Sequence, residues 1–147
     1  MKTATFLLVA ALALLSAGHC HAAEAAGSAT PGLRLIMQEL GRQMQLGADA
    51  IAREDWAAIA ALAPKLAEHA APPVTEKLRI LGALGGQAGQ FRELDQQVHH
   101  AAQAMGAAAQ SKDGQAVIAA YARVQTACLA CHQGFRQPLK DALESKR

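Results

Sequence analysis

Two cysteines and a histidine near the C-terminal end carry the strongest chemical signal in this sequence. Cys128-Leu129-Ala130-Cys131-His132 has the C-x-x-C-H spacing that attaches c-type haem. On a helix, positions i, i+3 and i+4 share one face, so both thiols and the imidazole can point the same way. The thiols can add to the two vinyl groups of a haem, and the imidazole can reach its iron. The motif therefore predicts one covalently bound haem c held by Cys128 and Cys131, with His132 as an iron ligand.

Three other uses of this cysteine pair compete with haem attachment. A disulfide between positions three apart in a regular helix would close only a tiny loop and constrain little. A thioredoxin-like dithiol normally lies at a helix N-terminus, where the helix dipole favours the thiolate, whereas this pair lies near a predicted helix C-terminus. A zinc site would need further ligands at suitable spacing, and the sequence contains no second cysteine cluster.

The other face of the iron either takes a second ligand or stays open. Met37 and Met44 are seven residues apart and share the inward side of one predicted helix, so spacing cannot choose between them. A lone methionine on an apolar face is usually core filler. The remaining candidates are Met105, His69, His99 and His100. We interpret the three histidines as solvated helix surface, with a bis-histidine haem as the alternative.

The composition indicates that helices position these residues. Alanine occurs 36 times, whereas Val, Ile and Thr occur five times each, which favours helix over sheet. Apolar periodicity predicts four helices. They cover residues 31–52, the segment from Asp55 to Pro72-Pro73, residues 87–110 and residues 115–137. Pro64 should kink or break the second helix, and Pro138 should end the last one. The glycine-rich segment 75–86 is expected to be a loop with at most one helical turn.

Four helices with short connections predict an all-α fold, an antiparallel four-helix bundle spanning residues 28–147. Much of the inward surface of these helices is alanine, and Phe, Tyr and Trp together number five. Alanine layers leave space between helices unless something else fills it, because interiors pack at near-crystal density. This composition fits a bundle whose core is completed by a large, flat prosthetic group.

The first residues have the pattern of a secretory signal peptide. A basic start at Lys2 precedes an apolar run over 6–17 that is too short to span a membrane, and small residues follow. We predict a signal peptide over 1–22, with cleavage somewhere in 22–26. Lipid modification at Cys20 is the alternative, but Ala17 and His19 stand where leucine and a small residue would be expected. No second long apolar run follows, so we expect an exported, periplasmic protein without a membrane span.

The charge balance excludes one class of partner. Lys and Arg total 14 against 12 acidic residues, a net charge of +2, which lacks the excess positive charge that phosphate backbones require. Nucleic acid is therefore not expected as a partner. A near-neutral surface also gives little electrostatic steering towards other proteins.

Both ends of the expected domain resemble class II c-type cytochromes, the family of cytochrome c′ and the low-spin cytochrome c-556. The segment from Cys128 to Arg136 is similar to their C-x-x-C-H-x-x-[YF]-R ending, and Ile36 to Met44 is similar to the [LI]-M-x-x-x-G-R-x-M run of the low-spin members. The resemblance implies Met37 as the second iron ligand, Met44 as a core residue and a propionate contact for Arg136. It covers residues 31–137 in outline, and the middle of the chain shows no family signature.

The resulting hypothesis is electron transfer by a single-haem c-type cytochrome with redox partner proteins of unknown identity. Filling both axial positions would exclude substrate from the iron, and no nucleophile or general base is apparent, so we do not expect an enzyme. The main alternative is a high-spin, five-coordinate protein that binds NO or CO if Met37 does not bind the iron. A structural bundle without haem is a third class. A homodimer, as in cytochrome c′, is compatible with the sequence, although no residue identifies an interface.

Overall fold

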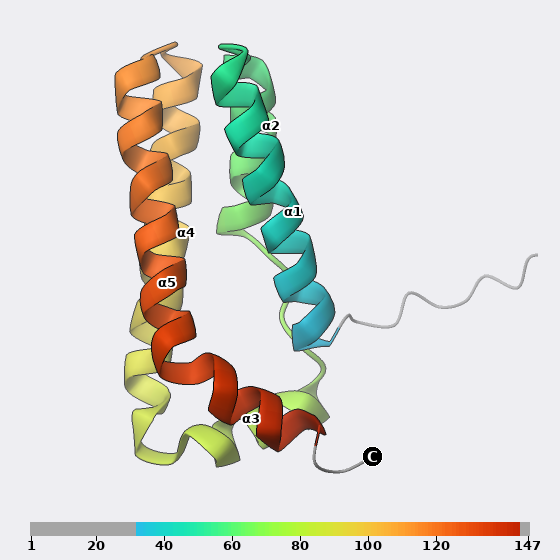
Figure 1. The fold of residues 1–147 in the computed structure, drawn as a ribbon. Coiled ribbons are helices and arrows are strands. Elements are labelled where there is room, and N and C mark those ends of the chain that lie inside the picture. Colours follow the sequence, from blue (N-terminus) through green and yellow to red (C-terminus); the bar gives the residue numbers. More distant parts are fainter. Residues whose placement is uncertain (1–31, 145–147) are drawn as a thin grey trace, which may run out of the picture.

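The computed structural model describes residues 32–144, and the predicted signal peptide lies outside this range. Its elements are α1 (Leu33–Ala52), α2 (Trp56–Ala67), α3 (Val74–Leu84), the short 3-10 helix η1 (Gly85–Gln87), α4 (Ala88–Gln110) and α5 (Gly114–Glu144). Helices α1, α2, α4 and α5 run alternately up and down (Figure 1), which confirms the predicted antiparallel four-helix bundle. Within the described part of the chain, no helix is long and apolar enough to cross a membrane.

Aspartate side chains cap the starts of α2 and α5. The predicted cap at Asp55 is confirmed, because its carboxylate accepts a hydrogen bond from the Ala58 amide at 2.9 Å at the start of α2. Helix α2 continues through Pro64 and ends at Ala67, before the Pro72-Pro73 pair. Asp113 accepts a hydrogen bond from the Ala116 amide at 3.0 Å and so supports the start of α5.

The loop predicted over 75–86 is wrong, since α3 fills most of that segment. Ile80 and Leu84 become buried there, and the Arg79 guanidinium donates hydrogen bonds to the carbonyls of Ala142 and Leu143 at 2.8 and 2.9 Å. Both of these carbonyl groups belong to the end of α5. Packing against a distant segment thus stabilises a helix whose glycines, taken alone, predict a loop.

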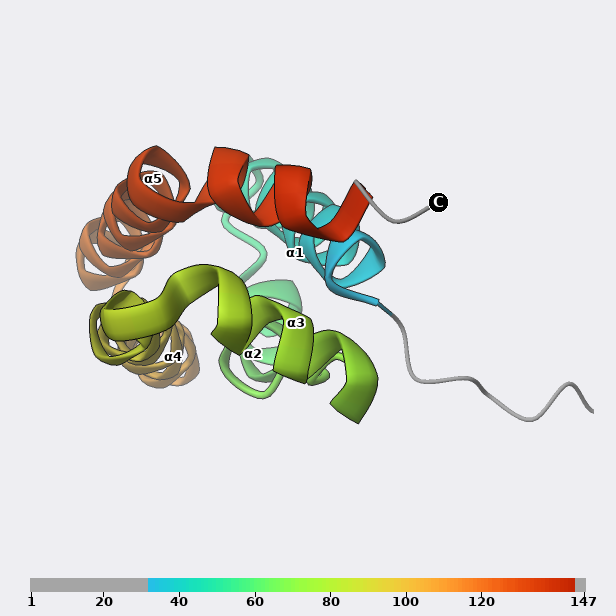
Figure 2. The same ribbon diagram turned by 90° about the horizontal axis from the view of Figure 1, so that it is seen from below.

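The predicted end of the last helix at Pro138 is also wrong. Helix α5 runs to Glu144 with Pro138 inside it, although proline removes a helical hydrogen bond and bends the chain. Figures 1 and 2 show that the end of α5 turns sharply and runs beside α3 across the bottom of the bundle. Leu139 is buried in this extension, and its burial helps to offset the disruption caused by the proline.

The apolar core has two parts. The upper cluster joins α1, α2, α4 and α5 and includes Ile59, Leu66, Met105, Val117 and Val124, all fully buried. The lower cluster joins α3 and α5 through Ile80, Leu84, Phe135 and Leu139, with Leu33, Ala88, Phe91, Leu94, Cys131 and Leu143 packed around them. Phe91 and Phe135 meet edge to face, with ring centroids 5.4 Å apart.

Small residues bring α2 and α4 close together. A Cβ atom added at Gly106 of α4 would lie 3.0 Å from the Cβ of Ala63 in α2, closer than side chains normally approach. Ala67, Ala102 and Ala109 are also buried along this contact. These two helices thus use small side chains to approach each other.

We predict that Gly106→Leu lowers the free energy of unfolding by about 1–3 kcal/mol, because the new side chain must push α2 away from α4. The control is Gly82→Leu, since Gly82 lies in α3 with no atom within 4 Å of an added Cβ. Urea unfolding of both variants measures the difference. Equal stability of the two variants would show that the α2–α4 contact is not tight.

Candidate haem site

Helix α5 presents the predicted attachment residues in consecutive turns. Cys128 and Cys131 are free thiols and half-buried, whereas His132 and Arg136 are exposed. The two thiols lie at the boundary of the two core clusters, because Cys128 packs against the upper cluster and Cys131 against the lower one. The i, i+3 and i+4 positions therefore place two sulfur atoms at the margin of the core and an imidazole next to them.

Helix α1 carries the candidate methionines on one stripe, Leu33, Met37, Leu40 and Met44. Leu33 packs against the lower cluster, as Cys131 does, and Leu40 and Met44 pack against the upper cluster, as Cys128 does. Met37 lies between them on the helix, belongs to neither cluster and is 38% exposed. It is thus level with the two thiols and is not used as core filler, whereas Met44 packs in the core.

The neighbouring helices α1 and α5 make few contacts with each other, although α1 packs on α2 and α5 packs on α4. One of these contacts is Tyr121, whose hydroxyl donates a hydrogen bond to the Met44 carbonyl at 2.7 Å and whose ring lies against Gly47. Tyr121 precedes Cys128 by about two helical turns. Beyond this contact, the upright part of α5 and α1 diverge towards the bottom of the bundle, and the end of α5 then turns back towards the start of α1 (Figure 1).

Burial holds both thiols in the protonated form. It raises the pKa of Cys128, and it raises the pKa of Cys131 to about 11, with smaller contributions from the negative charge of Asp95 and from the neighbouring Cys128. Two neutral thiols, an exposed imidazole on the same helix and an exposed thioether on the neighbouring helix form a donor set suited to haem c. The residues present therefore fit a haem.

The α1 motif contains polar interactions that sequence reasoning missed. The guanidinium of Arg42 donates two hydrogen bonds to the Glu39 carboxylate, at 2.9 and 2.7 Å. These bonds, with one from the Gln43 amide, hold the pKa of Glu39 at about 2. Gln43 is itself buried, and its side-chain oxygen has no hydrogen-bond partner in residues 32–144. The guanidinium of Arg42 is thus paired with the Glu39 carboxylate on the surface of α1.

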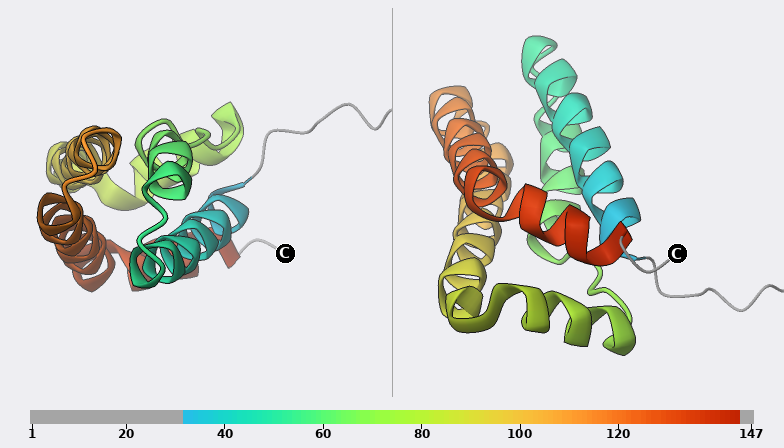
Figure 3. Two further views of the ribbon diagram at one scale, coloured as in Figure 1. Left: turned by 90° about the horizontal axis from the view of Figure 1, so that it is seen from above. Right: turned by 60° about the horizontal axis from the view of Figure 1, so that its bottom comes forward.

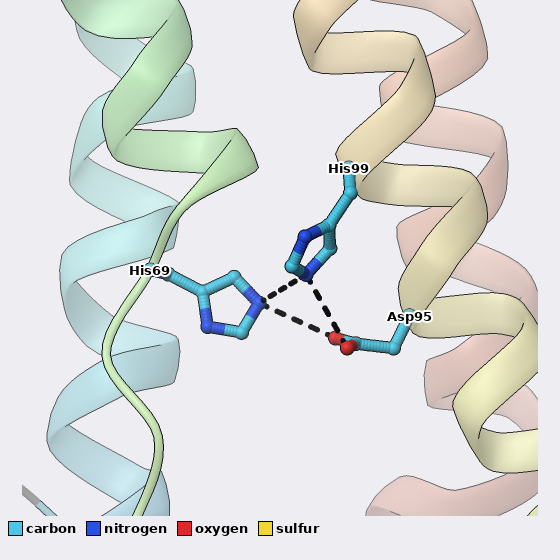
Figure 4. A group of neighbouring side chains, drawn as sticks. All are labelled: His69, Asp95 and His99. Atoms are coloured by element: carbon cyan, nitrogen blue, oxygen red, sulfur yellow. Dashed lines mark hydrogen bonds and ion pairs between the residues drawn. The ribbon is translucent and has the colours of Figure 1, made fainter.

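Three further side chains meet on the side where α2 packs against α4. His69 follows α2, and Asp95 and His99 lie one turn apart on α4 (Figure 4). The interpretation as solvated surface is wrong for His69 and His99, which are half-buried, and is confirmed for His100, which is exposed. The i, i+4 spacing of Asp95 and His99 is visible in the sequence, but nothing local brings His69 to them.

Contacts within this histidine cluster (His69, Asp95 and His99) shift the pKa values of His69 and Asp95. The hydrogen bond to Asp95 raises the pKa of His69 and outweighs the opposing effect of burial, with a further contribution from the Ala70 carbonyl. The same bond is the main reason that the pKa of Asp95 is lowered, and the nearby His99 adds to this effect. A protonated His69 paired with an ionised Asp95 is thus favoured in mildly acidic solution.

The fold and the candidate site define an all-α bundle protein that presents a c-type haem attachment sequence on its last helix. Residues 34–136 match the protein-family model described as Cytochrome C', and the chain therefore belongs to the cytochrome c′ family. The match extends from α1 to Arg136 and includes α3. Searches of curated proteins and of solved structures found no match.

Membership of this family implies that the chain binds haem c. The members are mainly non-enzymatic haem proteins, typically periplasmic, that transfer electrons or bind small gases. The family match does not distinguish an iron with two protein ligands from one with a single ligand. The assignment of individual residues to the haem therefore stays a prediction.

The histidine cluster generates a prediction about pH. The raised pKa of His69 contributes stability below about pH 6.5 that is lost as the pH rises through the folded-state pKa, and the lowered pKa of Asp95 contributes stability above about pH 4 that is lost on acidification. We expect Asp95→Asn to cost most near pH 5, by up to about 1 kcal/mol because Asp95 is partly exposed, and less above pH 7.

Urea unfolding at several pH values, in buffer containing EDTA, measures this dependence. Glu93→Gln is the matched control, since Glu93 is an exposed carboxylate on the same helix outside the cluster. A pH-independent difference between Asp95→Asn and the natural chain would show that the ion pair does not form.

Proposed function

We propose that this protein is an exported electron-transfer protein with one covalently bound haem c. Cys128 and Cys131 would supply the thioether bonds, and His132 and Met37 would bind the iron from its two sides. The observation that carries the proposal is the position of Met37, exposed on α1 between the two core clusters and level with the two thiols of α5. A thioether that is left out of the core at this level is available as a ligand.

When bound, haem c supplies one-electron chemistry between ferrous and ferric iron. The protein's contribution would be to hold the iron with two ligands, His132 and Met37, so that substrates and gases would not reach the metal. A methionine thioether opposite a histidine raises the reduction potential. Phe91 and Phe135, which pack together in the lower cluster beside Cys131, would exclude water from one side of the group.

Arg136 lies one turn after His132 on α5, and its side chain is exposed. We assign it to a haem propionate, since a guanidinium forms bidentate hydrogen bonds with a carboxylate. The signal-peptide pattern in residues 1–22 supports export to the periplasm, where thioether attachment takes place. Redox partner proteins would dock without strong electrostatic steering, because the net charge of the whole chain is only +2.

Substitution of Met37 tests the ligand assignment. We expect the reduced holoprotein to show a low-spin visible spectrum that CO does not change, and Met37→Ala to convert it to a five-coordinate, high-spin form that binds CO. Met44→Ala is the matched control, because Met44 lies on the same stripe but packs in the core. A natural chain that binds CO readily, or a spectrum that responds to Met44→Ala and not to Met37→Ala, would contradict the assignment and favour the gas-binding alternative.

Mass spectrometry of the protein secreted to the periplasm tests the covalent attachment. We expect a chain that begins within residues 23–27, after cleavage in the predicted region, and is heavier by the mass of one haem. Replacing both Cys128 and Cys131 by alanine should remove the added mass, whereas Ser111→Ala, in the exposed turn between α4 and α5, should keep it. An unmodified mature mass for the natural chain would exclude both the electron-transfer and the gas-binding function.

A further inference from the structure

We propose that His69, Asp95 and His99 form a binding site for a divalent transition-metal ion, with Zn²⁺ as the fitting example. None of its three residues belongs to the predicted haem-attachment motif or is a proposed iron ligand. It lies between the segment that follows α2 and the first half of α4, as Figure 4 shows, so a bound ion would fasten these two parts of the bundle to each other. In the described part of the chain, this is the group of His, Cys, Asp and Glu side chains whose ligand atoms converge closely enough for a metal.

The spacing of the donor atoms matches a tetrahedral metal. The Nε2 atoms of His69 and His99 are 3.2 Å apart, and each lies 3.3 Å from an oxygen of the Asp95 carboxylate. Bonds of about 2.0–2.2 Å from zinc to nitrogen or oxygen place two tetrahedral ligands roughly 3.3–3.5 Å from each other. The two Nε2 atoms lie near this separation from each other, and each lies near it from one carboxylate oxygen, Oδ1 for His69 and Oδ2 for His99. With one ligand atom taken from each residue, all three donors lie within 4.8 Å of one another, so an ion could draw them together by small movements of the side chains.

The hydrogen bonding around His69 prepares it to bind a cation. Its Nδ1 lies 3.1 Å from the Ala70 carbonyl oxygen, to which it can only donate, so the neutral ring carries its lone pair on Nε2. A ligating histidine usually donates its second ring nitrogen to a carbonyl in this way, which fixes the ring and its tautomer.

When His69 is neutral, the cluster without a metal has too few protons for its acceptors. The lone pair of His69 Nε2 points towards the Asp95 carboxylate, which is itself an acceptor, and towards His99 Nε2. One proton on His99 cannot satisfy both the carboxylate and His69 with good geometry. A cation at the centre of the three atoms would satisfy all of them at once.

The chemistry of the donors selects the class of metal. Two imidazoles and one carboxylate suit zinc and copper, whereas calcium and magnesium prefer sites built from oxygen. The side chains of His69, His99 and Asp95 are 16, 31 and 40% exposed, so solvent can reach the cluster and supply a fourth ligand. The competing interpretation is a proton in place of the metal, shared between His69 and Asp95.

Calorimetric titration of EDTA-treated, desalted holoprotein with ZnCl₂ at pH 7.5 tests the site. We expect one zinc per chain and a loss of at least about tenfold in affinity for His99→Ala and for Asp95→Asn. His100→Ala is the matched control and should bind as the natural chain does, since His100 is exposed and outside the cluster. Affinity should also fall from pH 7.5 to pH 5.5, because protons compete for the imidazoles.

Absence of zinc binding by the natural chain would overturn the proposal, as would equal affinity in the natural chain and His99→Ala. Circular dichroism checks that each variant is folded, and the nearly isosteric Asp95→Asn keeps the test decisive if His99→Ala unfolds. The visible spectrum of the haem should not change in either variant, and a changed spectrum would show that the cluster belongs to the haem site. Failure of the Met37 assignment leaves the zinc titration unaffected, so the two proposals fail separately.

Discussion

The close contact of α2 with α4 is the constraint on which the arrangement of this bundle depends. Gly106 and Ala63 bring the two helices so near that a single added methyl would not fit without movement. The hairpin of α1 and α2 is thereby joined to the hairpin of α4 and α5 mainly through the contact of α2 with α4. The view from above in Figure 3 shows α2 beside α4, and α1 on the side of α5. Helices α1 and α5 are left with few contacts between them, and these are the helices that carry Met37 and the C-x-x-C-H motif.

The two kinds of candidate chemistry lie on different pairs of helices. On the side of α1 and α5, two thiols lie at the boundary of the upper and lower clusters, and Met37 is level with them outside the core. On the side of α2 and α4, the histidine cluster lies where α2 ends and the chain turns towards α3. Loose packing suits the insertion of a large flat group, whereas close packing brings short side chains from two segments within reach of one small ion.

Sequence patterns predicted the elements whose causes are local. The extents of α1 and α4 follow from apolar periodicity, and the cap at Asp55 and the turn before α5 follow from capping and turn chemistry within a few positions. The same reasoning failed for α3 and for the end of α5. Ile80 and Leu84 are buried against Phe135 and Leu139, so each of these two segments is helical because the other is present. No local signal contains that dependence.

The functional residues also divide into those that the sequence predicts and those that depend on how the helices pack. The sequence alone determined the C-x-x-C-H motif, because i, i+3 and i+4 residues share a helix face in any helix, and this motif carries most of the functional argument. Only the tertiary structure decided that Met44 packs in the core while Met37 stays outside it, and only the tertiary structure brought His69 to Asp95 and His99. Burial and contacts between distant segments depend on how helices pack, which the spacing of residues along one chain does not specify.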